Sequence, residues 1–586
     1  MDELLISRDE LDFLLWEWLG LEEVLGGSGS VDRDSAAAIL DVSQELAVDA
    51  FLSHWKGSDA NEPQVVDGRV RAYPPIGEAL RRYAEMGLFS AGFAEELGGS
   101  GLPMLLASAS FAQFLAANVA TAAYPMLTAA NARLIATFGS AAQVDAFARP
   151  QIAGEWFGTM CLSEPQAGSN LADVATRAMP DGEDELGRRY RLTGNKMWIS
   201  GGDHDLSDNI VHLVLAKVPD ADGRLAPTTR GLSLFIVPRR LPDGSDNDIA
   251  VAGINHKMGY RGTTNCLLNF GERGDGAIGW LVGAEGQGLP QMFQMMNEAR
   301  INVGLGAAAL GYRGYALAKR YATERLQGRP AGSDAPPGSR PIIEHPDVRD
   351  MLMAAKCHAE GALALVLYCA RLVDQEHGSA EAAALLGLLT PVAKTYPSEW
   401  GLVANDLAIQ VHGGYGYTRD FDVEQLWRDN RLNPIHEGTT GIQGLDLVGR
   451  KLLRDDAGAL AMLRARIDAT IAAARAAGVL VQEADTLEAV WTHIGDVTAT
   501  LKGAGVSASV NATAMLRAFG HGVVAWQWLD RALLCADADA ATDPFRAGKR
   551  WACRYYFERE VPRIAAWLAP VAACSTLTAE IPADCI

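Results

Sequence analysis

Glu437 is the residue whose position in this sequence most strongly suggests a chemical role. It lies in NPIHEGTTGIQGLDLVGRKL, between a histidine and a glycine, with two threonines shortly after it. Four apolar residues then follow at helical spacing and predict an amphipathic helix: Ile442, Leu445, Val448 and Leu452. A carboxylate at a helix N-terminus is stabilised by the helix dipole. Position alone therefore favours a capping or solvated glutamate, and a role as a general base needs support from the rest of the chain.

Two motifs in the middle of the chain are able to hold a flat polar ligand. CLSEPQAGSN offers the hydroxyls of Ser163 and Ser169, with backbone N–H groups near the flexible Gly168. KMWISGG places an indole, Trp198, two residues from the hydroxyl of Ser200 on a predicted strand. An indole beside a hydroxyl can stack on a heteroaromatic ring and hydrogen-bond to its edge. Taken singly, the motifs are more typical of a loop and of a core tryptophan.

A glycine-rich stretch and two arginines suit an anionic ligand. QVHGGYGYTRD contains Gly413, Gly414 and Gly416, which permit close backbone approach to a ligand or a tight turn. Arg325, in YATERLQGR, is able to meet a pyrophosphate, and Arg300, in NEAR, lies about seven helical turns before it. Most helical arginines are solvated, so each residue alone is a weak indicator.

Gly304, Gly306 and Ala309 match the dinucleotide-binding pattern G-x-G-x-x-A by spacing only. That fingerprint requires a preceding strand within a β-α-β unit. Here the three residues lie inside a long helical pattern, where small residues allow close helix packing. We therefore reject a Rossmann nucleotide site.

Composition and charge limit the class of protein. A chain of 586 residues, 49% of them hydrophobic and 21% charged, is an ordinary globular composition and is long enough for three or four domains. Its 51 basic and 72 acidic residues give a formal charge of −21. Such a surface repels phosphate backbones, so we expect no nucleic-acid partner. A nucleotide needs only a few local cations and stays possible.

The eight cysteines are scattered, with no C-x-x-C pair and no histidine cluster nearby. We expect reduced, mostly buried thiols and neither disulfides nor a metal site. The N-terminal stretch MDELLISRDELDFLLWEWLGLEEVL is acidic and amphipathic, which is not the pattern of a signal peptide. No uninterrupted apolar run is long enough for a bilayer. The sequence predicts a soluble, cytoplasmic protein without an integral membrane segment.

The hydrophobic pattern changes along the chain. Residues 1–155 are helical, with apolar residues three and four apart, whereas residues 156–285 hold short β-prone runs separated by Gly, Asn, Asp and Pro. The pattern is helical again over residues 286–455 and in the Ala-rich residues 456–586. We therefore expect an α+β protein of four domains: a helical domain, a compact β-domain of antiparallel strands, a helical bundle and a further helical bundle.

The motifs, in this order, resemble those of the acyl-CoA dehydrogenase family of flavoproteins. They are CLSEPQAGSN, KMWISGG, HKMGYRGTT, NEAR, ATERLQGR, QVHGGYGYTRD and RDNRLNPIHEGTTGIQ, and the resemblance covers roughly residues 50–455. The N-terminal helix, HPDVRDML and the long helical C-terminus resemble the large subgroup, which includes 3-methylmercaptopropionyl-CoA dehydrogenases and bacterial long-chain enzymes. The resemblance implies a helical domain, a middle β-barrel, a C-terminal four-helix bundle and an extra helical domain, with FAD as cofactor.

By this resemblance the first motif lines the flavin. The implied cofactor-binding residues in this part of the chain are Met160, Leu162, Ser163, Gly168, Ser169, Trp198 and Ser200. Ser163 would touch the isoalloxazine ring, and Ser169 the pyrophosphate or the substrate. Trp198 would flank the ring, with Ser200 near N5. The family usually has Thr at the positions of Ser163 and Ser200 and Asp at that of Asn170, and these changes are mild.

The helical part of the chain supplies the other implied contacts. In the family, some residues hold the pyrophosphate and adenosine of FAD, partly across a subunit interface. The residues of this chain that match those positions are Arg325, His345, Gln410, Gly413 and Gly414. A shared site of this kind implies at least a homodimer. Thr439 would also contact the cofactor. Asn297 and Arg300 would face the CoA-bearing part of the substrate. Gly438 would contact the substrate, as Ser169 would.

Glu437 matches the catalytic base of the family. There, the backbone N–H at the glutamate and a ribityl hydroxyl of the flavin polarise the thioester carbonyl as an oxyanion hole, while the carboxylate removes the α-proton. A dry apolar pocket would raise the pKa of this carboxyl and strengthen it as a base. The β-hydrogen then leaves as hydride to flavin N5, which gives a trans-2-enoyl-CoA. His436 we interpret as a structural residue that shapes the pocket.

Three functions are open at this point. The first is an FAD-dependent acyl-CoA dehydrogenase of fatty acid β-oxidation that passes electrons to an electron-transfer flavoprotein. The second is an acyl-CoA oxidase, which oxygen consumption would distinguish. The third is a non-catalytic flavin-binding or DNA-binding relative, against which the acidic composition argues. The acyl group is open between fatty acyl-CoA and 3-(methylthio)propanoyl-CoA.

Overall fold

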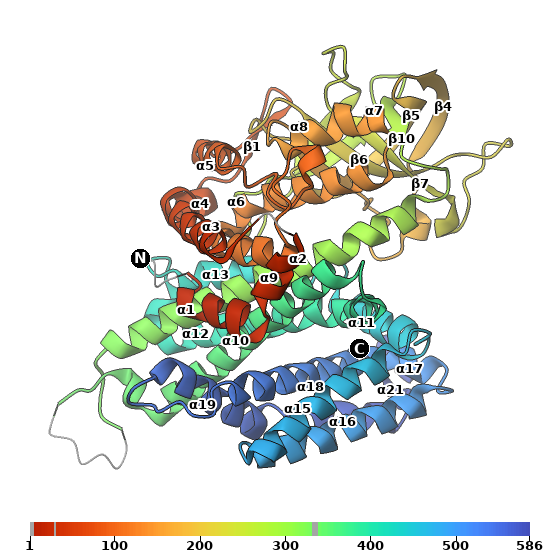
Figure 1. Cartoon of the computed structure of the whole chain (residues 1–586). Coiled ribbons are helices and arrows are strands. Elements are labelled where there is room, and N and C mark those ends of the chain that lie inside the picture. Colours follow the sequence, from red (N-terminus) through yellow and green to blue (C-terminus); the bar gives the residue numbers. More distant parts are fainter. Residues whose placement is uncertain (1–4, 29–30, 331–337) are drawn as a thin grey trace. The chain divides into compact units, whose positions relative to one another are not determined.

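The computed structural model describes residues 5–28, 31–330 and 338–586, apart from the side chains of residues 27, 28 and 294–297. The chain divides into two compact units, and each is assembled from separate stretches of sequence. The first unit contains Met1–Gly27, Met104–Ala116 and Arg300–Ile586, and the second contains Ser28–Pro103 and Ala117–Ala299. Figure 1 labels their elements.

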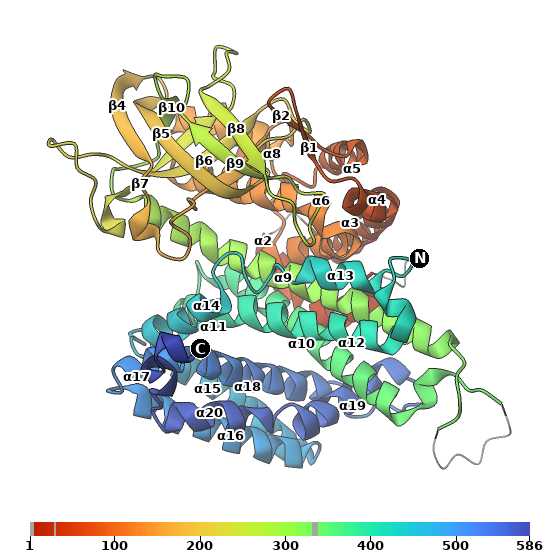
Figure 2. The same cartoon turned by 180° about the vertical axis from the view of Figure 1, so that it is seen from behind.

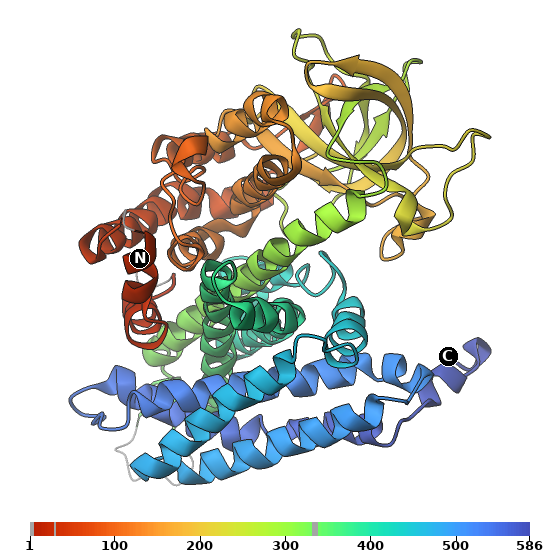
Figure 3. The same ribbon diagram turned by 45° about the vertical axis from the view of Figure 1, so that its right-hand side comes forward.

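The second unit is built around a β-barrel, as predicted for the middle of the chain. β10 pairs with both β7 and β5, so the row of neighbours β10–β7–β6–β4–β5 closes on itself. Figure 3 shows these strands curling around a common axis. β9 and β8 extend the second half of β5. The strands of the barrel and its extension are β3 (Phe157–Cys161), β4 (Arg177–Asp184), β5 (Gly187–Ser200), β6 (Ile210–Lys217), β7 (Leu232–Pro238), β8 (Ile249–Ile254), β9 (Asn265–Phe270) and β10 (Ala277–Leu281).

The expectation that all strands are antiparallel is wrong at β6. Its neighbours β3 and β4 both run parallel to it. β6 is buried at every position, which suits a strand with partners on both sides and covered faces. The alternation that marks a half-exposed antiparallel strand is therefore missing from its sequence, IVHLVLAK.

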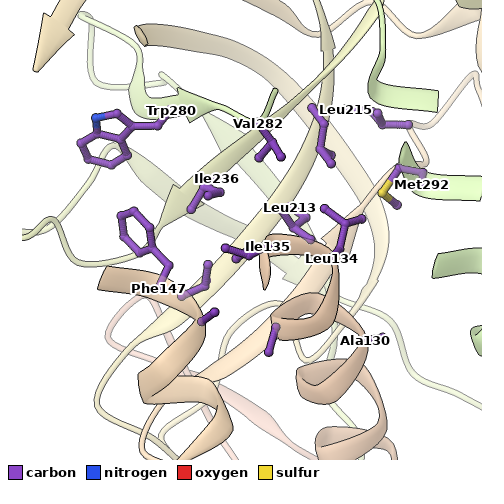
Figure 4. Packing of buried hydrophobic residues seen from close by; sticks show 14 of the residues in the cluster. Ala130, Leu134, Ile135, Phe147, Leu213, Leu215, Ile236, Trp280, Val282 and Met292 are labelled. Carbon is purple, nitrogen blue, oxygen red and sulfur yellow. The ribbon is translucent and has the colours of Figure 1, made fainter. Parts of the chain in front are cut away.

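The second unit also contains helices, of which α6 and α8 contribute to a core cluster with β6 and β7. The helices of this unit are α3 (Arg33–Leu46), α4 (Trp55–Ala60), α5 (Pro74–Glu85), α7 (Ala141–Gln143), α8 (Arg149–Ile152) and the part of α6 (Met104–Phe138) that follows residue 116. Figure 4 shows Leu134 and Ile135 of α6 packed with Leu213 of β6. Leu213 and Leu215 belong to this cluster, while Val214 belongs to the one inside the barrel. Alternate residues of β6 thus serve two cores.

A short hairpin interrupts the N-terminal region that was predicted to be helical. β1 (Gln64–Val66) and β2 (Arg69–Arg71) pair antiparallel. Asp67 and Gly68 form the turn, with φ of 51° and 72°. Both residues adopt a left-handed backbone, which is the geometry of a two-residue hairpin and the reason for the Asp-Gly sequence.

The first unit is helical. The predicted bundle consists of α10 (Pro346–Gln375), α11 (Ala380–Tyr396), α12 (Leu402–His412) and the part of α9 (Gly288–Glu324) that begins at Arg300. Small residues let these helices approach closely. A Cβ added to Gly304 of α9 would come within 2.0 Å of the carbonyl of Ala393 in α11. The pattern G-x-G-x-x-A therefore serves helix packing, which confirms that it is no nucleotide fingerprint.

Further helices complete the first unit, as expected for an additional C-terminal bundle. They are α1 (Arg8–Asp12), α2 (Leu21–Ser28), α13 (Val423–Asn430), α14 (Thr440–Asp446), α15 (Ala459–Ala477), α16 (Val481–Leu501), α17 (Val506–Val510), α18 (Ala512–Leu533), α19 (Pro544–Arg559), α20 (Arg563–Ala572) and α21 (Leu577–Glu580). Figure 2 shows α18 beside α15, α16 and α20. Lys549 of α19 pairs with both Glu10 of α1 and Glu360 of α10 in the buried interior, so the N-terminal segment belongs to this unit.

Two helices are long and apolar enough to cross a membrane by length and composition. They are Met104–Phe138 and Pro346–Gln375, and 83% of the most apolar window is buried in each. α6 is also interrupted at Asn118, whose φ is −158°. Burial of this extent is what the core helices of a globular unit show.

We predict that Gly304→Ala destabilises the protein by about 1–3 kcal/mol, because the new methyl group overpacks the contact between α9 and α11. Gly495→Ala is the matched control, because no atom lies within 4 Å of its added Cβ. Alanine is also the better helix former, so the control should be neutral or stabilising. Thermal unfolding of both variants checks this; equal melting temperatures would contradict the packing account.

Candidate active site

Glu437 lies in a tight turn between α13 and α14. Its backbone is left-handed, with φ of 52°, and Gly438 follows with φ of 89°. Thr439 caps α14 by accepting a backbone N–H of the first turn on its hydroxyl. Glu437 therefore does not cap the helix, contrary to what its position alone suggests. A non-glycine residue in this conformation costs about 1–3 kcal/mol and persists only where the surroundings hold it.

The predicted apolar face of α14 is wrong at Leu445, which is 45% exposed. Gln443, Gly444 and Asp446 are buried instead. A Cβ added to Gly444 would come within 2.9 Å of the backbone of Ala512 in α18. The helix thus packs through its small residue and turns two polar side chains inward: Gln443 toward the preceding turn and Asp446 toward Arg300.

Gln443 holds the Glu437 turn from the helix side. Its Nε2 donates to the carbonyl of Glu437 at 3.0 Å and to that of Gly438 at 3.4 Å. The side chain is fully buried. A buried amide that satisfies two carbonyls of a strained turn helps to fix the direction of the peptide groups in it.

Two buried cations act on the half-buried Glu437 carboxyl. Arg300 of α9 donates to Asp446 at 2.9 Å, and Lys394 of α11 donates to the carbonyl of Asn433 at 2.7 Å. Burial raises the pKa of Glu437, and Arg300 and Lys394 oppose that rise. Burial lowers the pKa of Lys394 to about 8. The result is a carboxylate that is a stronger base than a solvated glutamate.

His436, directly before Glu437, is neutral. Burial and the nearby Lys394 lower its pKa to about 3. Its Nε2 lies 3.0 Å from Oδ1 of Asn433. The imidazole is therefore part of the hydrogen-bonded interior that supports the turn, in agreement with a structural histidine.

In the second unit, the loop after β3 is anchored by a buried ion pair. Lys196 of β5 donates to Glu164 at 2.9 Å and to the carbonyl of Leu162 at 3.0 Å. Glu164 also accepts the N–H groups of Ala175 and Thr176 at 2.8 and 3.0 Å. Leu162 and Ser163 are half-buried, whereas Gly168 and Ser169 are exposed. The loop is thus fixed at its start and open at its end.

Trp198 lies at an irregularity of β5 beside this loop. The register with β9 shifts between Lys196 and Ile199, and Trp198 has φ of 66°. The bulge turns the indole outward, so that it is 58% exposed. The N–H of Met197 donates to the carbonyl of Ser163 at 3.0 Å, which brings the two predicted motifs together. Trp198 is not the core residue that a strand tryptophan usually is.

Ser200 and Met160 complete the predicted set in the second unit. The Oγ of Ser200 accepts from Nδ2 of Asn265 at 3.2 Å. Met160 is the half-buried fourth residue of β3. Ser200 belongs to the motif KMWISGG on β5, and Met160 directly precedes the motif CLSEPQAGSN.

In the first unit, Arg325 and His345 lie at the ends of a long loop. Residues 326 and 341 form an antiparallel bridge, and the N–H of Ile342 donates to the carbonyl of Arg325 at 2.8 Å. The Nε2 of His345 lies 2.8 Å from the carbonyl of Gln327. The length of the loop therefore does not separate His345 from Arg325, because its two ends are joined.

Arg325 also lies over the ring of Tyr415, 5.8 Å from its centre. Gln410, Gly413 and Gly414 are exposed in the same segment. Gly413 has φ of 61°, and no atom lies within 4 Å of a Cβ added to either glycine. These residues present bare backbone beside a cation, as an anionic ligand or a second chain requires.

Other predictions concern Asn297, the cysteines and a metal site. The side chain of Asn297 lies outside the described residues. All eight cysteines are free, and six of them are buried, in agreement with the expected burial. Within the described part of the chain, no group of three His, Cys, Asp or Glu side chains is suited to a metal ion.

Sequence reasoning missed Lys394, Gln443 and Asn433. Lys394 stands alone in the apolar run GLLTPVAKTY, and a lone lysine in a buried helix is a signal that was available. Gln443 and Asn433 carry no such signal. Their roles depend on which carbonyls the fold brings to them.

Four family models match successive parts of the chain. Three are described as Acyl-CoA dehydrogenase: the N-terminal domain matches residues 60–155, the middle domain 159–272 and the C-terminal domain 286–453. The fourth, Acetyl-CoA dehydrogenase C-terminal like, matches residues 463–582.

Relatives of known name match over similar lengths. A 3-methylmercaptopropionyl-CoA dehydrogenase of Ruegeria pomeroyi is 36% identical over 74% of this chain and 73% of its own. The broad-specificity linear acyl-CoA dehydrogenase FadE5 of Mycobacterium tuberculosis is 32% identical over 94% of this chain and 93% of its own. The structure of an acyl-CoA dehydrogenase from Bacillus anthracis complexed with FAD has a TM-score of 0.74 at 20% identity, covering 95% of this chain and 90% of that one. This last likeness shows a shared fold.

We predict that Lys196→Met costs about 3–5 kcal/mol of stability and loosens the loop after β3, because Glu164 is left as an unpaired buried charge. Bound FAD per chain should fall with it. Thermal unfolding and the absorbance of the purified protein measure the two effects.

The double variant Lys196→Met with Glu164→Gln is the matched control, since it removes both charges. It should recover much of the lost stability. A single variant as stable as the double one would contradict the role of the ion pair.

Proposed function

Since this chain belongs to the acyl-CoA dehydrogenase family of FAD-dependent oxidoreductases, we propose that it dehydrogenates an acyl-CoA thioester between Cα and Cβ, with Glu437 as the base. The observation that carries this proposal is the state of Glu437. It is a half-buried carboxylate with a raised pKa, held in a strained turn by residues on both sides of it.

The chemistry asks for a base of this kind. The proton on carbon next to a thioester is weakly acidic, so the base must be held close and its basicity raised. The N–H of Glu437 is able to donate to the thioester carbonyl as negative charge develops there. One residue thus supplies both the carboxylate and a backbone donor, and the product is a trans-2-enoyl-CoA.

The residues present suit FAD. Trp198 exposes its indole, and Ser163 and Ser200 lie close to it in the second unit. In the first unit, Arg325 lies over the ring of Tyr415, which directly follows Gly413 and Gly414 in the sequence, and the backbone of both glycines is open. We propose that these residues, with Met160, Leu162, Gly168, Ser169, His345, Gln410 and Thr439, hold the cofactor. FAD, when bound, supplies the acceptor for the hydrogen that leaves Cβ as hydride.

We propose that the substrate is either a linear fatty acyl-CoA or 3-(methylthio)propanoyl-CoA. The names of two relatives support both substrates: the one from Ruegeria pomeroyi is named for the methylthio substrate, and FadE5 for linear acyl-CoAs. Ser169, Asn297, Arg300 and Gly438 are the proposed contacts of the substrate. Arg300 already pairs with Asp446, so we expect it to act through charge more than through new hydrogen bonds.

We also propose a cytoplasmic homodimer that passes electrons to an electron-transfer flavoprotein. Exposed Gln410, Gly413 and Gly414 support a site shared between two copies. The competing oxidase would consume oxygen at the rate at which substrate disappears. An oxygen electrode and an assay with electron-transfer flavoprotein separate the two acceptors.

Glu437→Gln tests the base directly. We predict that the variant keeps bound FAD and loses reduction by acyl-CoA by about a thousandfold or more, because glutamine has the shape of glutamate and cannot accept the proton. Stopped-flow absorbance of the flavin band under anaerobic conditions measures the rate. A variant that is reduced at the rate of the unaltered protein would remove the proposed mechanism.

The pH dependence of the same rate follows from the raised pKa of Glu437. The base must be ionised, so the rate should fall as pH drops through this raised pKa, above the range of an ordinary glutamate. Lys394→Met removes a cation that opposes the rise in the pKa of Glu437. The fall of the rate on the acid side of the pH profile should therefore move to higher pH. Lys502→Met, at an exposed position, is the control. A shift of this fall in rate to lower pH in Lys394→Met would contradict the electrostatic account.

A further inference from the structure

Three buried asparagines in the first unit form a continuous chain of hydrogen bonds that ends at His436. Asn405 of α12 donates to the carbonyl of Leu310 in α9 at 2.8 Å. Asn430, at the end of α13, donates to Oδ1 of Asn405 at 2.7 Å. Asn433 donates to Oδ1 of Asn430 at 2.9 Å. None of the three asparagine side chains has accessible surface.

The direction of this chain is determined at its far end. A backbone carbonyl can only accept, so the NH₂ group of Asn405 must face Leu310 and its oxygen must face Asn430. The NH₂ group of Asn430 donates to that oxygen and also to the carbonyl of Ala307 at 3.2 Å. Its own oxygen must therefore face Asn433. Each amide is oriented by the one before it.

The last link decides the protonation of His436. The NH₂ group of Asn433 is used on Asn430, so Oδ1 of Asn433 faces Nε2 of His436, at 3.0 Å. An amide oxygen only accepts, so Nε2 must carry a hydrogen. In a neutral ring Nδ1 then has the lone pair.

We propose that Asn405, Asn430 and Asn433 are positioning residues that hold His436 as the Nε2–H tautomer and fix the turn from which Glu437 projects. The second part rests on the proposed function of Glu437 as the base; the first does not. Asn433 is the centre of the arrangement, because its carbonyl also accepts from Lys394 at 2.7 Å and its N–H donates to the carbonyl of Asn430 at 3.0 Å.

The arrangement explains how the turn resists relaxation. Glu437 and Gly438 are held from the helix side by Gln443. The amide chain holds the other side, and it is anchored on backbone carbonyls of α9. Rotation of the His436 ring would break the buried hydrogen bond between its Nε2 and Oδ1 of Asn433, which is unfavourable.

The first test is the tautomer of His436 in the full-length, FAD-loaded protein labelled with ¹⁵N-histidine. Long-range ¹H–¹⁵N spectra distinguish the two neutral tautomers and the imidazolium ion. The signal of His436 is the one that disappears in His436→Gln, with the exposed His377→Gln as control. We expect the neutral Nε2–H form from about pH 6 to 8. A neutral Nδ1–H form or an imidazolium ion would overturn the proposal.

The second test separates positioning from a merely structural role. His436→Gln keeps a donor for Asn433, whereas His436→Leu does not. We expect the rate of flavin reduction at saturating acyl-CoA to fall by about tenfold or more in His436→Leu, and by less in His436→Gln, since small misplacements of a catalytic group reduce rates by up to about a hundredfold. The dissociation constant of acyl-CoA should change by about threefold or less in both variants. Equal losses in the two variants would contradict the role of the hydrogen bond.

Asn433→Asp changes the last amide into a carboxylate of the same shape. We expect it to convert His436 to the imidazolium form at neutral pH, because a carboxylate on Nε2 favours the charged ring. A ring that stays neutral would show that Asn433 does not control it. Glu437→Gln keeps the two proposals separate. If the flavin of that variant is still reduced by acyl-CoA, Glu437 is not the base. The tautomer of His436 then still tests whether the three asparagines hold the ring.

Discussion

The left-handed backbone of Glu437 is the constraint on which the polar interior of the first unit depends. A glutamate with φ of 52° is unfavourable by about 1–3 kcal/mol and needs surroundings that over-determine it. Gln443 binds the turn on its helix side. Asn433, with Lys394 on its carbonyl, holds the other side. Polar groups that are costly to bury are thus concentrated where they hold the one carboxylate that the chemistry requires.

The second unit uses backbone strain in a related way. Trp198, with φ of 66°, stands at a bulge of β5. The bulge exposes an indole that an undisturbed strand would have buried in the barrel. The adjacent ion pair between Lys196 and Glu164 ties the loop after β3 to the same strand. In each unit, a strained residue that presents a functional group is next to a buried polar cluster that prevents the strain from relaxing.

Much of this architecture could be predicted because the signals are local. Period changes in hydrophobicity indicated a β-domain between helical bundles, and the family resemblance implied that this domain is a barrel. The helical context of Gly304 excluded a Rossmann site. Parallel pairing at β6 was missed because a fully buried strand lacks alternation. Leu445 was wrongly predicted to be buried because α14 packs through Gly444, which contacts Ala512, sixty-eight residues away. The hydrophobic pattern of the sequence does not show such a contact.

The site itself was only partly accessible from sequence. Glu437 was found through the resemblance and not through its spacing, which favoured a helix cap. The amide chain could not be found, since Asn405 and Asn430 are 25 residues apart and meet only in the fold. The proposed cofactor and substrate contacts stay predictions, as do the domain boundaries at residues 155, 285 and 455.

The measurement that tests the central claim most directly is anaerobic reduction of the flavin by an acyl-CoA deuterated at Cα. The comparison is with the same thioester undeuterated, in the unaltered protein and in Glu437→Gln. If Glu437 removes the α-proton, bleaching of the flavin band is slower with the deuterated substrate in the unaltered protein and is lost with both substrates in the variant. Bleaching that is insensitive to deuterium and persists without the carboxylate would contradict the account.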